Sequence, residues 1–100
     1  INLIKSESAE LSTSLLTKNL SLGYRNTQVK ILQKLLNLND FQLSAFGAGS
    51  PGNETDYFGL LTKKAVQKFQ LKYSVVDSIY DPGFGMFGPK TRAKLKEIIQ

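Results

Sequence analysis

The sequence predicts an all-α fold, a small closed three-helix bundle with long loops and an N-terminal extended arm. Apolar residues recur three and four positions apart in three segments, which is the pattern of helices that bury one face. The starts of two of these segments repeat one another, and a fainter third copy precedes them. A chain of 100 residues supports one hydrophobic core, so the repeats are expected to close around that core instead of forming an open solenoid.

The internal repeat marks the beginnings of the second and third helices. Residues 57–63 read Tyr-Phe-Gly-Leu-Leu-Thr-Lys, and residues 86–92 read Met-Phe-Gly-Pro-Lys-Thr-Arg. Glycine is tolerated as an N-cap, and proline fits the first helical position because its missing N–H would have no partner there. The repeat therefore predicts Gly59 and Gly88 as N-caps.

Each copy also places a phenylalanine just before the cap and a threonine three positions after it. We expect Phe58 and Phe87 to be partly buried anchors, because an apolar side chain at this position packs onto the first helical turns. The hydroxyls of Thr62 and Thr91 are expected to bond back to the cap.

The third copy, residues 29–33, shares with residues 66–70 an apolar residue, two free positions, a large apolar residue and a glutamine. An amide beside a core position can satisfy loop backbone groups that would otherwise be costly to bury. The sequence therefore favours a structural role for Gln33 and Gln70 over a ligand-binding one.

The predicted helices have the following bounds. The first begins at Asn26 or Thr27 and ends within residues 36–40, the second runs from Leu60 to Tyr73, and the third from Pro89 to Ile99. Inward positions are expected at Val29, Ile31, Leu32, Leu35, Leu36, Thr62, Ala65, Val66, Phe69, Tyr73, Thr91, Leu95 and Ile98. Solvent is expected to cover Lys30, Lys34 and Asn37 and the row Lys64, Lys68 and Lys72.

Two segments fall outside the helices on the N-terminal side and between the first two helices. Residues 1–15 are expected to form a linker or loosely docked arm, and residues 16–100 the domain, with residues 15–22 running extended against the helices. The connection 40–56 is long and rich in turn residues, which is typical of a functional or mobile loop. A chain that begins at Ile1 is expected to be an excised or processed fragment.

Composition limits the chemistry. The chain has no cysteine and no histidine, which excludes disulfides, thiolate nucleophiles and imidazole bases and leaves only carboxylates as metal ligands. The close acidic pairs, Glu54 with Asp56 and Asp77 with Asp81, lie in turn-rich loops and are expected to form turns instead of a glycosidase pair or a calcium loop. We therefore expect no catalytic residue, no metal site and no cofactor.

Five residues beside the predicted helix starts are candidate ligand-binding residues. They offer donors, acceptors and aromatic faces for a sugar or a peptide, and a structural role is the open alternative for each: Tyr24, Arg25, Asn26, Asp56 and Tyr57.

The motifs together resemble a known family. Leu20-x-x-Gly23, Val29-x-x-Leu32-Gln33-x-x-Leu36 and the two Phe-Gly-x-x-Thr copies are similar, in order and spacing, to the peptidoglycan-binding domain of bacterial cell-wall hydrolases and exported proteins. The resemblance covers about residues 16–99 and departs from the family at Gln28, where an acidic residue is usual, and at Asp56, where glycine is usual.

The resemblance implies a three-helix module without catalysis of its own. Its expected function is to target or anchor a larger exported protein by binding peptidoglycan, through the glycan or the stem peptide. The expected partners are peptidoglycan and other domains of the parent chain, and the expected location is the cell envelope or the extracellular space. No apolar run approaches membrane-spanning length, so membrane insertion is not expected.

Two alternatives remain. The formal net charge of +5 and three helices also fit a nucleic-acid-binding domain, although the basic residues are spread over all three helices and the connections are too long for a helix-turn-helix. The other alternative is a protein-interaction domain that keeps the fold and has lost the wall ligand.

Overall fold

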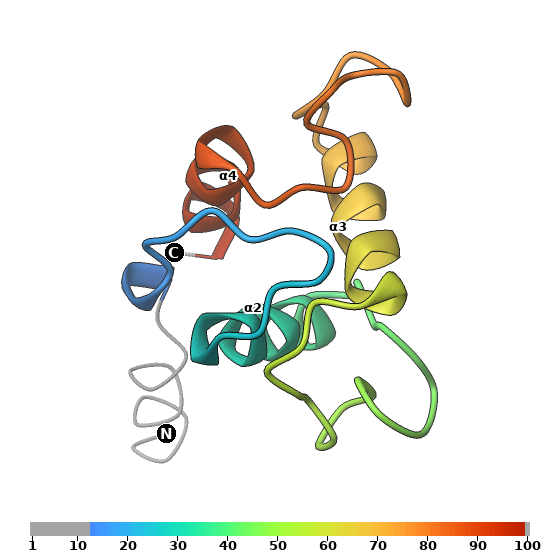
Figure 1. Ribbon diagram of the computed structural model, residues 1–100. Coiled ribbons are helices and arrows are strands. Elements are labelled where there is room, and N and C mark those ends of the chain that lie inside the picture. The colour runs from blue at the N-terminus through green and yellow to red at the C-terminus, as the bar shows by residue number, and fades with distance from the viewer. Residues whose placement is uncertain (1–12, 100) are drawn as a thin grey trace.

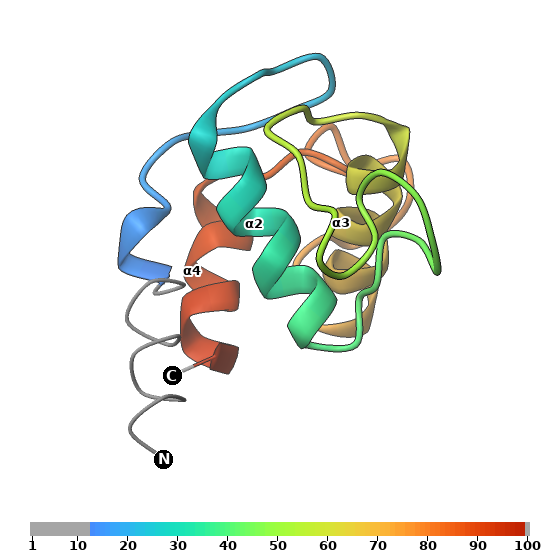
Figure 2. The same cartoon turned by 90° about the horizontal axis from the view of Figure 1, so that it is seen from below.

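The structure, a computed structural model, describes residues 13–99. This part of the chain contains three α-helices and one short 3-10 helix. In chain order they are η1 (Thr13–Leu15), α2 (Thr27–Leu38), α3 (Leu60–Lys72) and α4 (Pro89–Ile99). Figure 1 shows α3 lying crosswise to α2, and Figure 2 shows the same arrangement from below. Within residues 13–99 there are no named strands, only two isolated bridges. The prediction of an all-α three-helix bundle is confirmed.

The helix starts agree with the repeat. Asn26 is the N-cap of α2, and its side-chain oxygen accepts a hydrogen bond from the backbone N–H of Gln28 at 2.7 Å. Gly59 is the N-cap of α3, and its carbonyl accepts from the Lys63 N–H at 3.0 Å. The Gly88 carbonyl accepts in the same way from the Arg92 N–H at 2.9 Å. Both predicted glycine positions are therefore confirmed.

Gly59 contributes to packing beside the Tyr57 ring and not through backbone freedom. Its φ is −99°, which any residue can adopt. A Cβ atom added here would lie 3.2 Å from the ring of Tyr57. The missing side chain therefore leaves room for an aromatic ring against the first turn of α3.

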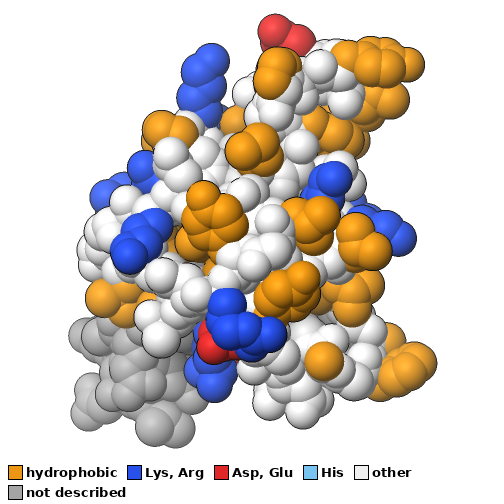
Figure 3. Space-filling model, viewed as in Figure 1, with side chains coloured by type: hydrophobic (Ala, Val, Ile, Leu, Met, Phe, Trp, Pro, Cys, Tyr) orange, Lys and Arg blue, Asp and Glu red, His pale blue; other side chains and the backbone are white. Residues whose placement is uncertain are grey.

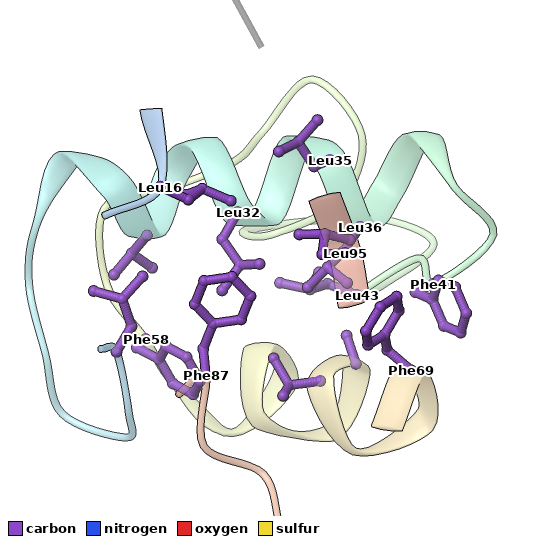
Figure 4. Close-up of a cluster of buried hydrophobic side chains, with 14 residues drawn as sticks. Leu16, Leu32, Leu35, Leu36, Phe41, Leu43, Phe58, Phe69, Phe87 and Leu95 are labelled. Atoms are coloured by element: carbon purple, nitrogen blue, oxygen red, sulfur yellow. The ribbon is translucent and has the colours of Figure 1, made fainter. Parts of the chain in front are cut away.

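The core lies between the helices and includes residues from the loops (Figure 4). Phe58 and Phe87, expected to be partly buried, are in fact fully buried, with 0% and 1% of their surfaces exposed. Their rings point inward from the connecting segments and fill the space between the helices. This central position explains why both rings are more deeply buried than a contact with the first helical turn alone would require. The buried hydrophobic cluster comprises Leu16, Leu20, Val29, Leu32, Leu35, Leu36, Phe41, Leu43, Phe58, Ala65, Val66, Phe69, Phe87 and Leu95.

The segment before α2 holds both Phe-Gly copies in place. Leu20 and Phe87 exchange two backbone hydrogen bonds, of 3.0 and 2.8 Å. The Gly23 N–H donates to the Phe58 carbonyl at 2.8 Å, and the Phe58 N–H donates to the Tyr24 carbonyl at 2.8 Å. The expectation that residues 15–22 run extended against the helices is confirmed around Leu20, which forms a bridge with Phe87, and is wrong at Leu15, which ends the 3-10 helix η1. This one segment positions the starts of both α3 and α4.

The predicted arm lies mostly outside the described residues. Residues 13–15 form η1, which contacts α4, and Thr13 is buried. Gln28 fastens the next residues, because its Oε1 atom accepts from the backbone N–H groups of Thr17 and Lys18 at 2.8 and 3.0 Å. A boundary between residues 15 and 16 stays a prediction.

Candidate functional site

A buried glutamine in α2 organises the connection to α3. The Nε2 atom of Gln33 donates to the Tyr57 carbonyl at 3.0 Å and to the Thr62 hydroxyl at 2.9 Å. Its Oε1 atom accepts from the Thr55 backbone N–H at 2.7 Å. Gln33 is 1% exposed, so these bonds satisfy an amide that has almost no access to water.

Gln70 in α3 does the same for the connection to α4. Its Nε2 atom donates to the carbonyls of Gly83 and Met86 and to the Thr91 hydroxyl, each at 3.0 Å. Its Oε1 atom accepts from the Gly85 N–H at 2.7 Å. We call Gln33 and Gln70 the hub glutamines. Their predicted structural role is confirmed. The Thr62 and Thr91 hydroxyls, which were expected to bond back to the caps, accept hydrogen bonds from these amides instead.

Each hub glutamine forms the floor of a groove beside a helix start. The first, which we call the Leu61 groove, has a volume of about 590 Å³. The second, the Lys90 groove, has a volume of about 560 Å³. The Leu61 groove is lined by Leu22, Gln33, Leu43, Tyr57, Leu60 and Leu61 among others, and the Lys90 groove by Tyr24, Gln70, Asp81, Met86, Pro89 and Lys90 among others.

The predicted binding residues meet on the surface between these grooves. Arg25 and Tyr57 form an isolated antiparallel β-bridge, and the Asn26 N–H donates to the Asp56 carbonyl at 2.9 Å. The Arg25 guanidinium forms a 2.6 Å ion pair with Asp56, and its carbon lies 5.0 Å from the centre of the Tyr57 ring. Tyr24 lines the Lys90 groove and Tyr57 the Leu61 groove. We call residues 24–26, 56 and 57 together the Arg25 surface.

These residues differ in how exposed their side chains are and in how many of their hydrogen-bonding groups are already used within the fold. Tyr24 and Tyr57 are 51% and 42% exposed, so both rings present a face to solvent. The Asn26 side-chain oxygen is occupied by its role as N-cap. Arg25 carries five N–H donors, and the contacts to Asp56 and Tyr57 leave it able to donate further.

Figure 3 views the molecule from the side shown in Figure 1. Apolar side chains are distributed over this face among polar ones, with basic groups between them. Leu22, Leu60, Leu61 and Met86, which line the two grooves, are 48%, 64%, 43% and 48% exposed. The grooves therefore offer apolar contact that is open to solvent.

Asn37 corrects one expectation. It was expected to face water, but its side chain ties down the long loop 40–56. Its Nδ2 atom donates to the Gly49 carbonyl at 3.0 Å and to the Glu54 carboxylate at 2.8 Å, and its Oδ1 atom accepts from the Leu43 N–H at 2.9 Å. Helical periodicity places Asn37 on the polar side of α2, and that side is covered by a loop whose path local sequence does not specify.

Glu54 makes this loop sensitive to acid. Partial burial acts to raise the pKa of Glu54, but hydrogen bonds from Asn37 and from backbone N–H groups, with the positive charge of Lys34, outweigh burial and lower the pKa below its ordinary value. A carboxylate with a lowered folded-state pKa stabilises the fold above its unfolded pKa, and this contribution is lost as the pH falls through the folded pKa.

We therefore expect acidification to loosen the loop 40–56 before the helices unfold. The Gly49 N–H donates to the Asn53 carbonyl at 2.8 Å and the Asn53 N–H to the Ser50 carbonyl at 2.7 Å, so the protection of these two amides against hydrogen exchange, relative to the intrinsic rate at each pH, should fall as Glu54 is protonated. The Glu54→Gln chain is the control, because its amide does not titrate. The same acid-induced loss of protection in both chains would show that another group is responsible.

Asp56 and Asp81 stabilise an ion pair and a turn. Asp81 accepts from the Gly83 N–H at 2.7 Å, and Asp56 pairs with Arg25. Residues 13–99 contain no cluster of three or more side chains suited to hold a metal ion. In the same part of the chain, no helix is both long and apolar enough to cross a bilayer.

The fold and surface define a small helical domain with two open grooves on its loops. The family model described as "Putative peptidoglycan binding domain" matches residues 25–83, which is more than half of the chain. The chain belongs to this family of peptidoglycan-binding domains, and membership associates it with the bacterial cell wall. No curated protein and no solved structure matches it. The family match spans α2, α3 and both hub glutamines.

Proposed function

We propose that this chain is a non-catalytic wall-binding module that holds a larger exported protein at peptidoglycan through the Arg25 surface. The observation that carries the proposal is the convergence of five exposed or half-buried residues from two separate loops, between two open grooves, in a domain of this family. The predicted binding role of Tyr24, Arg25, Asn26, Asp56 and Tyr57 remains a proposal.

The chemistry of the Arg25 surface suits a sugar or peptide ligand. Aromatic faces contribute contact area, and the Tyr24 and Tyr57 rings are about half exposed in the loops that carry the ion pair. Asp56 holds the Arg25 guanidinium in one direction, which preorganises its remaining donors for a polar ligand.

The same features argue for binding without catalysis. The chain contains neither imidazole nor thiol, and Glu54, Asp56 and Asp81 are engaged in hydrogen bonds that hold loops. One shallow site binds weakly, so retention at the wall would come from several modules acting together on one exported chain.

The test is co-sedimentation with insoluble peptidoglycan. Changing Tyr24 and Tyr57 together to alanine should abolish retention while leaving the helices folded, because both rings are about half exposed. Wild-type retention should persist at near-physiological salt, since aromatic and hydrogen-bonding contacts are screened less than exposed charge pairs. The supernatant should contain no soluble wall fragments.

The matched control removes charge from α3. Lys64 and Lys68 are exposed and are changed together to alanine, which should weaken retention only modestly. Lys72 is left unchanged, because its ammonium lies 5.6 Å from the rings of both Phe41 and Tyr73 and replacing it would disturb packing. A general polyanion binder would behave differently: retention would be lost at higher salt and in the lysine variant, and would be unchanged in the tyrosine variant.

A further inference from the structure

The two grooves occupy equivalent places in the internal repeat but differ in chemistry. Both have a hub glutamine at the floor and the first turn of the following helix as one wall. The first turn of α3 lines its groove with uncharged side chains, Leu60, Leu61 and Thr62. The first turn of α4 lines its groove with Pro89, Lys90 and Thr91, which include a lysine. In the order of the repeat, the corresponding lining residues are Tyr57 and Met86, Leu60 and Pro89, and Leu61 and Lys90.

We propose that the Lys90 groove is the subsite for the peptide part of peptidoglycan, a short peptide that carries carboxylates, an amino group and alanine methyl groups. This proposal rests on the proposed function and adds the part of the polymer that is recognised. The Leu61 groove lacks charged lining residues and is assigned no peptide role.

Charges of both signs line the Lys90 groove. Lys90 is exposed, and Asp81 is half-buried with its Oδ1 atom accepting from the Gly83 N–H. The ion pairs within residues 13–99 are Arg25 with Asp56 and Lys94 with Glu97, so Lys90 and Asp81 do not neutralise each other. A ligand with separated negative and positive groups can therefore satisfy both.

The remaining lining suits the uncharged parts of such a peptide. Tyr24, Met86 and Pro89 offer exposed apolar surface for methyl groups, and the volume of about 560 Å³ is within the usual range for small-ligand sites. The N-acetylated sugars of the glycan backbone are neutral, whereas the stem peptide carries the carboxylates and the amino group. Charge complementarity therefore favours the peptide over the glycan as the occupant of this groove.

The test compares two soluble probes by NMR titration of the whole chain. One probe is a synthetic tetrapeptide of alanine, D-glutamate, a diamino acid and alanine. The other is glycan strands stripped of peptide, with the lactyl carboxyl groups that this exposes capped as amides so that the strands stay neutral. The tetrapeptide should shift the backbone signals of Ser21, Gly83 and Thr91, which line the Lys90 groove. Glycan strands should leave these signals unchanged.

A variant designed from the repeat tests the charge. Lys90→Leu places in α4 the residue that α3 carries at the corresponding position, so the helix start should accept it. The Kd for the tetrapeptide should rise about fivefold, which corresponds to a loss of about 1 kcal/mol for an exposed charge contact. Lys68→Leu removes the same charge from an exposed position outside both grooves and should leave the Kd unchanged.

The outcomes separate this inference from the proposed function. A chain that sediments with whole peptidoglycan but does not bind the tetrapeptide, or binds it equally well after Lys90→Leu, overturns the peptide assignment alone. Shifts of the groove signals by glycan strands in place of the tetrapeptide do the same. A chain that neither sediments with the wall nor binds the tetrapeptide overturns both proposals.

Discussion

Replacing Phe58 or Phe87 with alanine is expected to destabilise the domain by about 3–5 kcal/mol, the usual cost of emptying a fully buried aromatic position. Both rings are almost wholly inaccessible, and the backbone of each is fixed by hydrogen bonds to residues 20–24. The surroundings therefore cannot easily collapse into the cavity. Since small domains are stable by about 5–15 kcal/mol, either change removes a large share of the free energy of unfolding and should lower the denaturant midpoint clearly.

Denaturant titration followed by circular dichroism measures this loss, and Phe46→Ala is the matched control. Phe46 is 82% exposed, so the same change there should alter the free energy of unfolding by less than about 0.5 kcal/mol. Wall binding by the Phe58 and Phe87 variants should fail only in proportion to the unfolded fraction. A variant that keeps its stability and loses wall binding would make the phenylalanine a ligand contact.

The second large effect is expected at Gln70. Gln70→Leu keeps a similar volume but removes an amide that makes four hydrogen bonds at the start of α4. At about 1 kcal/mol for each bond, the variant should lose roughly 4 kcal/mol, and more where a buried partner such as the Gly85 N–H finds no water.

Hydrogen exchange locates this effect as well as measuring it. Protection of the Gly85 amide should fall in Gln70→Leu, because its acceptor at 2.7 Å is removed. Gln67→Leu is the control on the same helix, at a half-buried position. If Gln67→Leu and Gln70→Leu were equally stable, the hub would not be a principal source of stability for the connection between α3 and α4.

The helices were predictable because their signals are local. Asn26 can be recognised as an N-cap from its type and its place before an apolar stripe, and α4 begins at a proline that suits a first helical position. The internal repeat added information about the hub glutamines, because the same amide beside the same core position appears twice. These elements required no knowledge of which loop lies over which helix.

The contacts of the loops depend on which loop lies over which helix, and the sequence did not predict this. Asn37 and Gln28 look like ordinary polar helix residues, and their partners lie up to 17 positions away in segments without periodicity. The grooves likewise arise where segment 19–24 passes beside both helix starts. The proximity of residues 24–26 to residues 56 and 57 was expected only in the sense that both flank helix starts, and their bridge is a tertiary contact.

The hub glutamines also separate the framework of the domain from its loop tips. Gln33 bonds to Thr55, Tyr57 and Thr62, all close to the start of α3, so the loop tip at Phe46 lies outside that hub. In the second connection, Tyr80 at 87% exposure is likewise outside the bonds that Gln70 makes. Foreign peptides grafted at these two tips would leave both hubs intact, which makes the domain a suitable display scaffold with two independently replaceable loops.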